Sequence, residues 1–185
     1  MRITLVRHAE VEERYHSCYN GAIDIDLSEK GIAQAKELAS YLDTQNYDAV
    51  FCSDLLRAKK TLEHSIHSQD AIYTSQLREK SWGKHEGMRF DTIIAQGEIE
   101  YIDFMQWIKA LDGEEYTSYI QRVQEFFFET LPSLNKQNVL VVTHAGVIRV
   151  LIALVQELSL EDAFCIRIDY SSCVFYNVSS QSFCF

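Results

Sequence analysis

Residues 5–10 have the sequence Leu-Val-Arg-His-Ala-Glu, and this stretch predicts more about the fold than any other part of the chain. It continues an apolar run, Ile3 to Val6, that is typical of a buried strand, so Arg7 and His8 fall where that strand ends. A second apolar run, at 139–142, stops in the same way at Thr-His-Ala-Gly, with the histidine at position 144. Because ligands of open α/β sheets bind at the carboxyl ends of the strands, we expect both histidines in one site.

Strand-like and helix-like segments alternate along the rest of the chain, which predicts an α/β fold. Ser28 is the expected N-cap of a helix that continues to Leu42, and a helix at 115–131 is expected to close at Pro132. Further strands are expected at 47–53, 72–74, 172–178 and 181–185, and further helices at 55–66, 90–113 and 147–155. No repeat or linker divides the sequence, so residues 1–185 are predicted to form one domain.

The charge of the chain excludes some classes of partner. Its formal net charge is −10, whereas binders of nucleic acids or acidic membranes need a basic surface. An anionic ligand must therefore be held by a local cluster of arginines against the overall field. We expect no leader segment, because the first residues run directly into a strand. The sequence has no apolar run long enough to cross a membrane, and its five cysteines include no Cys-x-x-Cys pair. We expect free, mostly buried thiols and a soluble, cytoplasmic protein.

The residues at the predicted strand ends suit a phosphate ester. Arg7 and Arg57 carry planar, permanently charged groups that match phosphate oxygens. Two guanidinium groups nearby should lower the pKa of His8 and keep it in the neutral, nucleophilic form. His144 precedes a buried helix whose first N–H groups favour an anion. Zinc is the alternative ligand of two histidines, but the arginines would repel a dication and no further ligands complete a set. We therefore expect neither a metal nor a cofactor.

Five ordered blocks of sequence resemble the histidine phosphatase superfamily, which has the phosphoglycerate-mutase-like fold. The blocks are Leu5–Glu10, Gly21–Gly31, Ser53–Thr61, Leu77–Gly87 and Val142–Val147. The resemblance implies a three-layer α/β/α fold with a mostly parallel central sheet. It also implies that His8 forms a phosphohistidine, that Arg7, Arg57 and His144 hold the phosphoryl group, and that Glu79 is the general acid and base.

Departures from the family pattern bear on what is bound. Ala9 replaces the glycine of the Arg-His-Gly signature, and Arg14 stands where many relatives carry an asparagine that contacts phosphate. Asn20 could take over that contact, and we predict Asn20 and Gly21 as substrate-binding residues. His85 replaces a tryptophan, and it either reaches the substrate or, as we favour, fills space.

The resemblance implies a metal-independent phosphomonoesterase that acts on a small phosphorylated metabolite. The alternatives are a phosphoglycerate mutase and a binding protein that has lost its chemistry. The mutases are longer, and they carry Glu-Arg-His-Tyr-Gly where this chain has Glu-Lys-Ser-Trp-Gly at 79–83, so we favour the phosphatase. Specificity should come from a lid at 90–113. Its Phe104 and Trp107 could stack on a base or sugar, but we expect them to be core residues. Exposed phenylalanines among 126–128, together with 183 and 185, make a homodimer possible.

Overall fold

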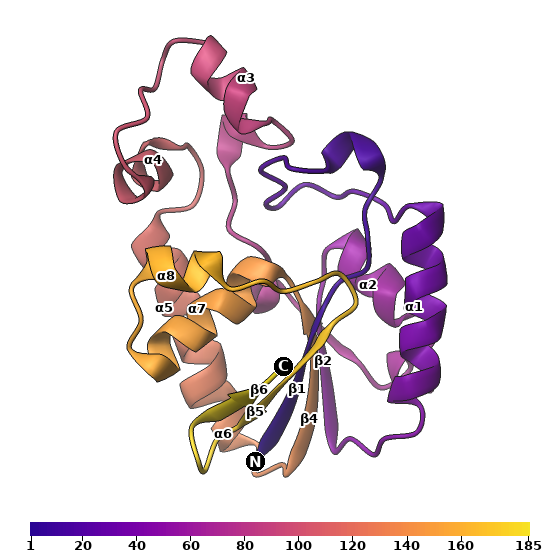
Figure 1. The fold of residues 1–185 in the computed structure, drawn as a ribbon. Helices are drawn as coiled ribbons and strands as arrows, with labels where there is room; N and C mark the ends of the chain where they lie inside the picture. Colours follow the sequence, from indigo (N-terminus) through magenta and orange to yellow (C-terminus); the bar gives the residue numbers. More distant parts are fainter.

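The computed structural model describes residues 1–185, and it places a six-stranded sheet between two layers of helices (Figure 1). The strand order is β3-β2-β4-β1-β5-β6. Strands β1 to β4 run parallel to one another, whereas β5 is antiparallel to β1 and forms a hairpin with β6. The strands are β1 (Arg2–Arg7), β2 (Ala49–Ser53), β3 (Ile72–Thr74), β4 (Asn138–Thr143), β5 (Cys173–Asn177) and β6 (Ser182–Cys184). The predicted three-layer, mostly parallel architecture is confirmed.

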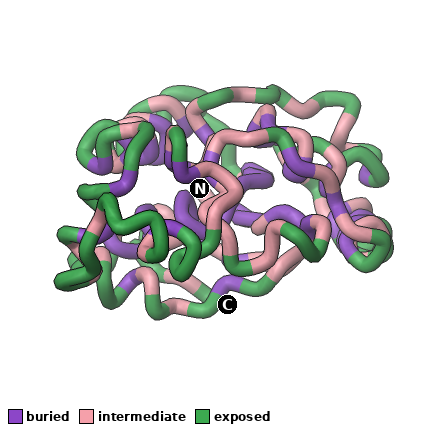
Figure 2. Tube along the Cα trace, turned by 90° about the horizontal axis from the view of Figure 1, so that it is seen from above, coloured by how far each residue is buried: buried purple, intermediate pink, exposed green.

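The two layers follow from the alternation of side chains along the central strands. Ile3 and Leu5 of β1 pack into the larger core beneath α5 (Tyr116–Glu125) and α7 (Ala145–Gln156), whereas Val6 packs into the smaller core. That smaller core is covered by α1 (Glu29–Leu42) and α2 (Leu56–Leu62), on the other side of the sheet (Figure 1). Seen from above, buried segments gather in the middle of the molecule, between exposed outer loops (Figure 2).

The register of the sheet brings the two histidines together. Arg7 pairs with Thr143 across the parallel strands β1 and β4, and the N–H of His8 donates to the carbonyl of Thr143 at 2.9 Å. Both strands therefore end at the same level, at the upper edge of the sheet in Figure 1. A lid segment, residues 90–113, rises above this edge and contains α3 (Phe90–Ala95) and α4 (Phe104–Ala110).

Several predicted elements need correction at their ends. The helix at 115–131 does not close at Pro132: α5 passes into a π-helical turn, η5 (Phe126–Thr130), and then into α6 (Leu131–Ser133). Pro132 lies in the first turn of α6, where its missing N–H is tolerated. The helix α8 (Leu160–Cys165) was not predicted, although Ser159 caps it by accepting from the N–H of Asp162 at 3.1 Å. The Ser28 cap is confirmed, since its Oγ accepts from the N–H of Gly31 at 2.9 Å.

The cysteines and phenylalanines follow the expectations only in part. All five cysteines are unpaired, as expected, but only Cys52 is buried; Cys18 and Cys173 are half-buried, and Cys165 and Cys184 are exposed. Of the three consecutive phenylalanines, Phe128 is exposed while the other two are buried in the core. Phe185, at the chain end, is exposed as well.

None of the helices combines the length and the apolar character that crossing a lipid bilayer demands.

Candidate active site

His8 presents one free ring nitrogen to a cavity above the sheet. Its Nδ1 lies 2.8 Å from the carbonyl oxygen of Ala9, which can only accept, so Nδ1 carries the proton. Nε2 is then unprotonated and has no protein partner. Burial lowers the pKa of His8 well below its ordinary value, and the positive charges of Arg57 and Arg7 lower it further. The tautomer and the charge state are those of a nucleophile.

The lowered pKa of His8 predicts its charge in solution. At about pH 6 an ordinary histidine, with a pKa of about 6.5, is mostly cationic. We expect His8 in the free protein to remain neutral there, because its imidazolium form would be desolvated beside two guanidinium groups. The check is a ¹⁵N NMR titration of the imidazole, assigned with a His8→Gln variant, alongside a short histidine peptide in the same buffer. A cationic His8 at this pH would contradict the expectation.

The two predicted phosphate-binding arginines are held by backbone carbonyls. Nη1 of Arg7 donates to the carbonyl of Ile168 at 2.6 Å, and its guanidinium carbon lies 3.8 Å from the ring centroid of Tyr170. Arg57 is buried and donates to three carbonyls of the 20–23 segment, the shortest being 2.6 Å to that of Gly21. Burial lowers the pKa of Arg57 to about 10, so it stays charged near neutral pH. In both arginines the buried Nε has no partner.

His144 lies against His8, at the N-terminus of α7. The two ring centroids are 5.1 Å apart, and Nε2 of His144 lies 2.8 Å from Oγ of Ser53. Its Nδ1 is buried without a partner. Burial and the charge of Arg57 lower the pKa of His144 well below the ordinary value. The buried Nδ1 of His144 and the buried Nε atoms of the two arginines are thus hydrogen-bonding groups without a protein partner, which suits an anion that accepts several hydrogen bonds.

Glu79 lines the cavity, and its carboxyl group accepts three hydrogen bonds. Its Oε1 accepts from the hydroxyl of Tyr119 at 2.6 Å and from the N–H of Lys80 at 3.1 Å. Its Oε2 accepts from the N–H of Gly146 at 2.9 Å. A side chain at Gly146 would overlap the Glu79 carboxylate, so only glycine permits this contact at the start of α7.

The loop residues that we singled out have different places. Asn20 lines the cavity, but its amide nitrogen donates to the carbonyl of Tyr15, which leaves Oδ1 buried without a partner. Gly21 lies behind the cavity wall, where its N–H donates to Glu86 at 2.7 Å. Arg14 is exposed and paired with a neighbouring glutamate, away from the site. His85 is buried and accepts from the N–H of Asp112 at 2.9 Å, so it fills space outside the cavity.

A cavity of about 570 Å³ extends from His8 to the lid segment. Its walls are mostly apolar and rich in aromatic rings from the lid. Trp107 is buried, as expected, and its indole N–H donates to the hydroxyl of Tyr19 at 2.6 Å. Phe104 packs against the core, but both of these side chains also line the cavity. The expected core role and a role in contacting substrate are therefore compatible.

Several residues of the site were not singled out from the sequence. Tyr119 and Tyr170 come from segments without a motif, and only the folded chain brings them to Glu79 and Arg7. Ser53 and Gly146 lie inside motif blocks, and a glycine next to the first residue of a buried helix was a usable signal of close approach. No group of three or more His, Cys, Asp or Glu side chains is arranged to hold a metal ion.

The fold and the site define an α/β protein of the phosphoglycerate-mutase-like class. The chain matches the family model of the histidine phosphatase superfamily (branch 1) over residues 3–183, and it belongs to this superfamily.

Relatives with phosphatase and mutase names both resemble the chain. An adenosylcobalamin/alpha-ribazole phosphatase of Salmonella typhimurium is 32% identical over 158 residues, which cover 83% of this chain and 78% of the relative. The structure of the alpha-ribazole phosphatase from Shigella flexneri superposes with a TM-score of 0.83 at 26% identity, covering 99% of this chain and 93% of that one. A 2,3-bisphosphoglycerate-dependent phosphoglycerate mutase of Xanthobacter autotrophicus is 27% identical, covering 97% and 93% respectively.

Proposed function

We propose that the protein hydrolyses phosphomonoesters of small metabolites through a phosphohistidine at His8, without a metal ion. The observation that carries the proposal is the free Nε2 of His8, beside the unpartnered nitrogens of Arg7, Arg57 and His144. Transfer of a phosphoryl group needs a neutral nucleophile, here His8, and fixed positive charges, here those of Arg7 and Arg57. Membership of the superfamily and the phosphatase names of its relatives support the same reaction.

In the first step, Nε2 of His8 attacks phosphorus, and the bond from phosphorus to the ester oxygen breaks. Glu79 gives its proton to the leaving alcohol oxygen, which therefore departs as a neutral alcohol. Arg7 and Arg57 match the charge on the phosphoryl oxygens throughout, and His144 offers them a hydrogen bond.

In the second step, water attacks the phosphohistidine. Glu79, now a carboxylate, takes a proton from the water as the oxygen bonds to phosphorus. The bond between phosphorus and Nε2 breaks, which releases inorganic phosphate and returns His8 to its neutral form. The contacts of Glu79 with Tyr119 and Gly146 hold the carboxylate in place for both proton transfers.

Phosphatase and mutase differ in what attacks the phosphohistidine, water or a bound phosphoglycerate. We expect steady release of inorganic phosphate from p-nitrophenyl phosphate, and no interconversion of 2- and 3-phosphoglycerate with or without 2,3-bisphosphoglycerate. The check is a phosphate assay beside a coupled mutase assay on the same preparation, with a chelator present in a second series. Mutase turnover comparable to hydrolysis, or loss of hydrolysis with the chelator, would contradict the proposal.

The cysteines, the relatives and the exposed phenylalanines bear on the cellular location, the substrate and the oligomeric state. We place the protein in the cytoplasm, because its five cysteines form no disulfide. A screen of phosphorylated metabolites identifies the substrate, and it includes alpha-ribazole 5′-phosphate because relatives are named for alpha-ribazole. A homodimer through the exposed Phe128 or Phe185 stays a prediction.

A further inference from the structure

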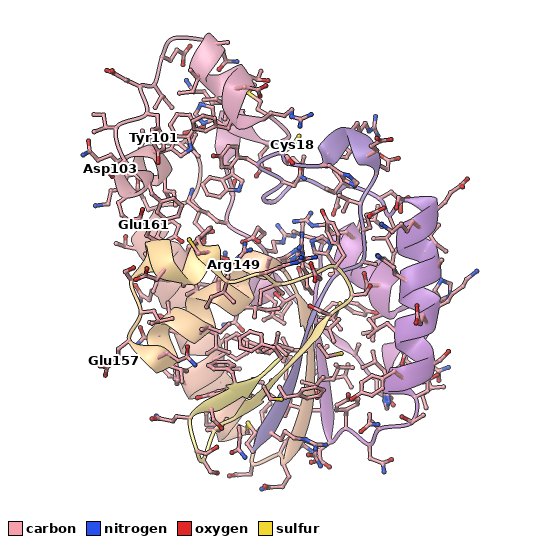
Figure 3. All side chains as sticks on the ribbon, viewed as in Figure 1. Cys18, Tyr101, Asp103, Arg149, Glu157 and Glu161 are labelled. Carbon is pink, nitrogen blue, oxygen red and sulfur yellow. The ribbon has the colours of Figure 1, made fainter.

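Arg149 is a cation of the cavity that the proposed chemistry does not use. It is the fifth residue of α7 and lies below the lid segment (Figure 3). Its Nε donates to the carbonyl of Ile166 at 2.9 Å, and its guanidinium carbon lies 5.6 Å from the ring centroid of Phe164. These contacts fix the guanidinium plane. Its two terminal nitrogens, the edge that can bind a carboxylate, have no protein partner and form no ion pair.

Tyr116 supplies an unsatisfied hydroxyl to the same part of the cavity. Its side chain lines the cavity at 6% exposure, and its hydroxyl is buried without a hydrogen-bond partner. Its ring lies 6.5 Å from that of Phe164, which Arg149 also contacts. The charge of Arg149 acts on the Tyr116 hydroxyl, and both groups feel the charge of Glu79. A buried hydroxyl left without a partner is costly, and a bound ligand would satisfy it.

No acidic side chain of the cavity wall forms an ion pair with Arg149. The wall contains three cations, Arg7, Lys80 and Arg149, and Glu79 as its one acid. Arg7 serves the phosphoryl group. Lys80 donates to the carbonyl of Ser81 at 3.0 Å and is surrounded by acidic residues outside the cavity. In a chain with a net charge of −10, an arginine without a carboxylate partner in a ligand cavity points to an anionic group on the ligand.

We propose that Arg149 and Tyr116 form a second anion subsite, which binds a carboxylate on the alcohol part of the substrate. The inference rests on the proposed function and deepens it, since it makes the substrate class a phosphorylated hydroxy acid. The planar guanidinium edge matches the two carboxylate oxygens, and the Tyr116 hydroxyl donates a further hydrogen bond. The single charge of Arg149 matches one carboxylate, whereas a second phosphoryl dianion would leave net negative charge there.

Two esters that differ only in the relevant group test the subsite. 3-Phosphoglycerate carries a carboxylate where glycerol 3-phosphate carries a hydroxymethyl group, and phosphate release is measured for both. We expect the wild-type kcat/KM to favour 3-phosphoglycerate by about 10- to 100-fold, the range for hydrogen bonds to charged groups. Arg149→Met should bring this ratio close to one, and Arg149→Lys should keep part of it. Arg2→Met, at the far end of β1, is the matched control and should leave the ratio unchanged.

The ratio separates binding of the carboxylate from general damage to the site. A loss of fold would lower both activities together and leave their ratio unchanged. Tyr116→Phe gives a second test, because it removes only an unsatisfied hydroxyl. This variant should lower the ratio about threefold or more. A wild-type ratio near one, or an unchanged ratio in Arg149→Met, would overturn the subsite while phosphate release still supports the proposed function. No release from either ester or from p-nitrophenyl phosphate would overturn the function and the subsite together.

Discussion

Replacing His8 by alanine is expected to lower kcat/KM for p-nitrophenyl phosphate by about 10⁴-fold or more, as the loss of a nucleophile does in other enzymes. The reason lies in the geometry of the site. Nε2 of His8 is the unprotonated nitrogen that faces the cavity, and the opposite nitrogen is fixed by the carbonyl of Ala9. Without the His8 imidazole, water must attack the ester directly, and the arginines can only stabilise that slower reaction.

The matched control for His8→Ala is His64→Ala, because His64 lies on the surface beside Glu63. That variant should keep wild-type activity, and both variants should show unchanged circular dichroism. A binding protein without chemistry would behave differently, since the wild type itself would release no phosphate. Retention of more than a tenth of the activity in His8→Ala would reject His8 as the nucleophile.

The same prediction has a covalent signature. Quenching the wild type in denaturant during turnover of a ³²P-labelled ester should leave an acid-labile, base-stable label on the chain, and peptide mapping should place it at residue 8. The label should be absent from His8→Ala and should persist longer in a variant that slows attack by water. Hydrolysis by the wild type without any trapped label would point to direct attack by water instead.

The sequence was sufficient for those parts of the site that lie at strand ends. Arg7 and His144 could be placed because an apolar run fixes where each strand stops, and parallel pairing of β1 and β4 then brings both ends to one level. Helix α1 could be predicted equally well, because its cap and its apolar face are local signals in the sequence. The roles of Arg57 and Glu79 came from the family motif rather than from periodicity.

Contacts between distant loops could not be predicted in this way. Whether Arg57 reaches the phosphate or the carbonyls of residues 20–23 depends on how two loops pack, and no spacing in the sequence encodes that. The hydroxyl of Tyr119 meets Glu79 across 40 positions, and Arg149 faces the cavity only because α7 is oriented by its packing on α5 and α8. The cap of α8 was a local signal, but its short length gave too little periodicity to identify the helix.

Replacing Glu79 by glutamine should lower kcat/KM, which reports the step that forms the phosphohistidine, in proportion to how much the leaving group needs a proton. For glycerol 3-phosphate, whose alkoxide is a poor leaving group, we expect a loss of about 10²- to 10⁴-fold, the usual contribution of general acid–base catalysis. For p-nitrophenyl phosphate, whose phenolate leaves without a proton, the loss should be about tenfold or less. Glutamine keeps the shape of the side chain, but it cannot donate the proton. Its NH2 group also replaces one of the two oxygens that accept hydrogen bonds from Tyr119, Lys80 and Gly146.

The comparison of the two esters distinguishes proton transfer from a structural role of the same side chain. If Glu79 only supported the cavity through Tyr119 and Gly146, its replacement would slow both esters by the same factor, and equal losses would reject it as the general acid. Glu129→Gln is the matched control, since Glu129 is exposed on the π-helical turn and should affect neither ester. Because Glu79 also accepts a proton from water in the second step, its replacement should slow hydrolysis of the phosphohistidine. With ³²P-labelled p-nitrophenyl phosphate, formation of the phosphohistidine is slowed less than its hydrolysis. Labelled phosphohistidine should therefore accumulate in Glu79→Gln.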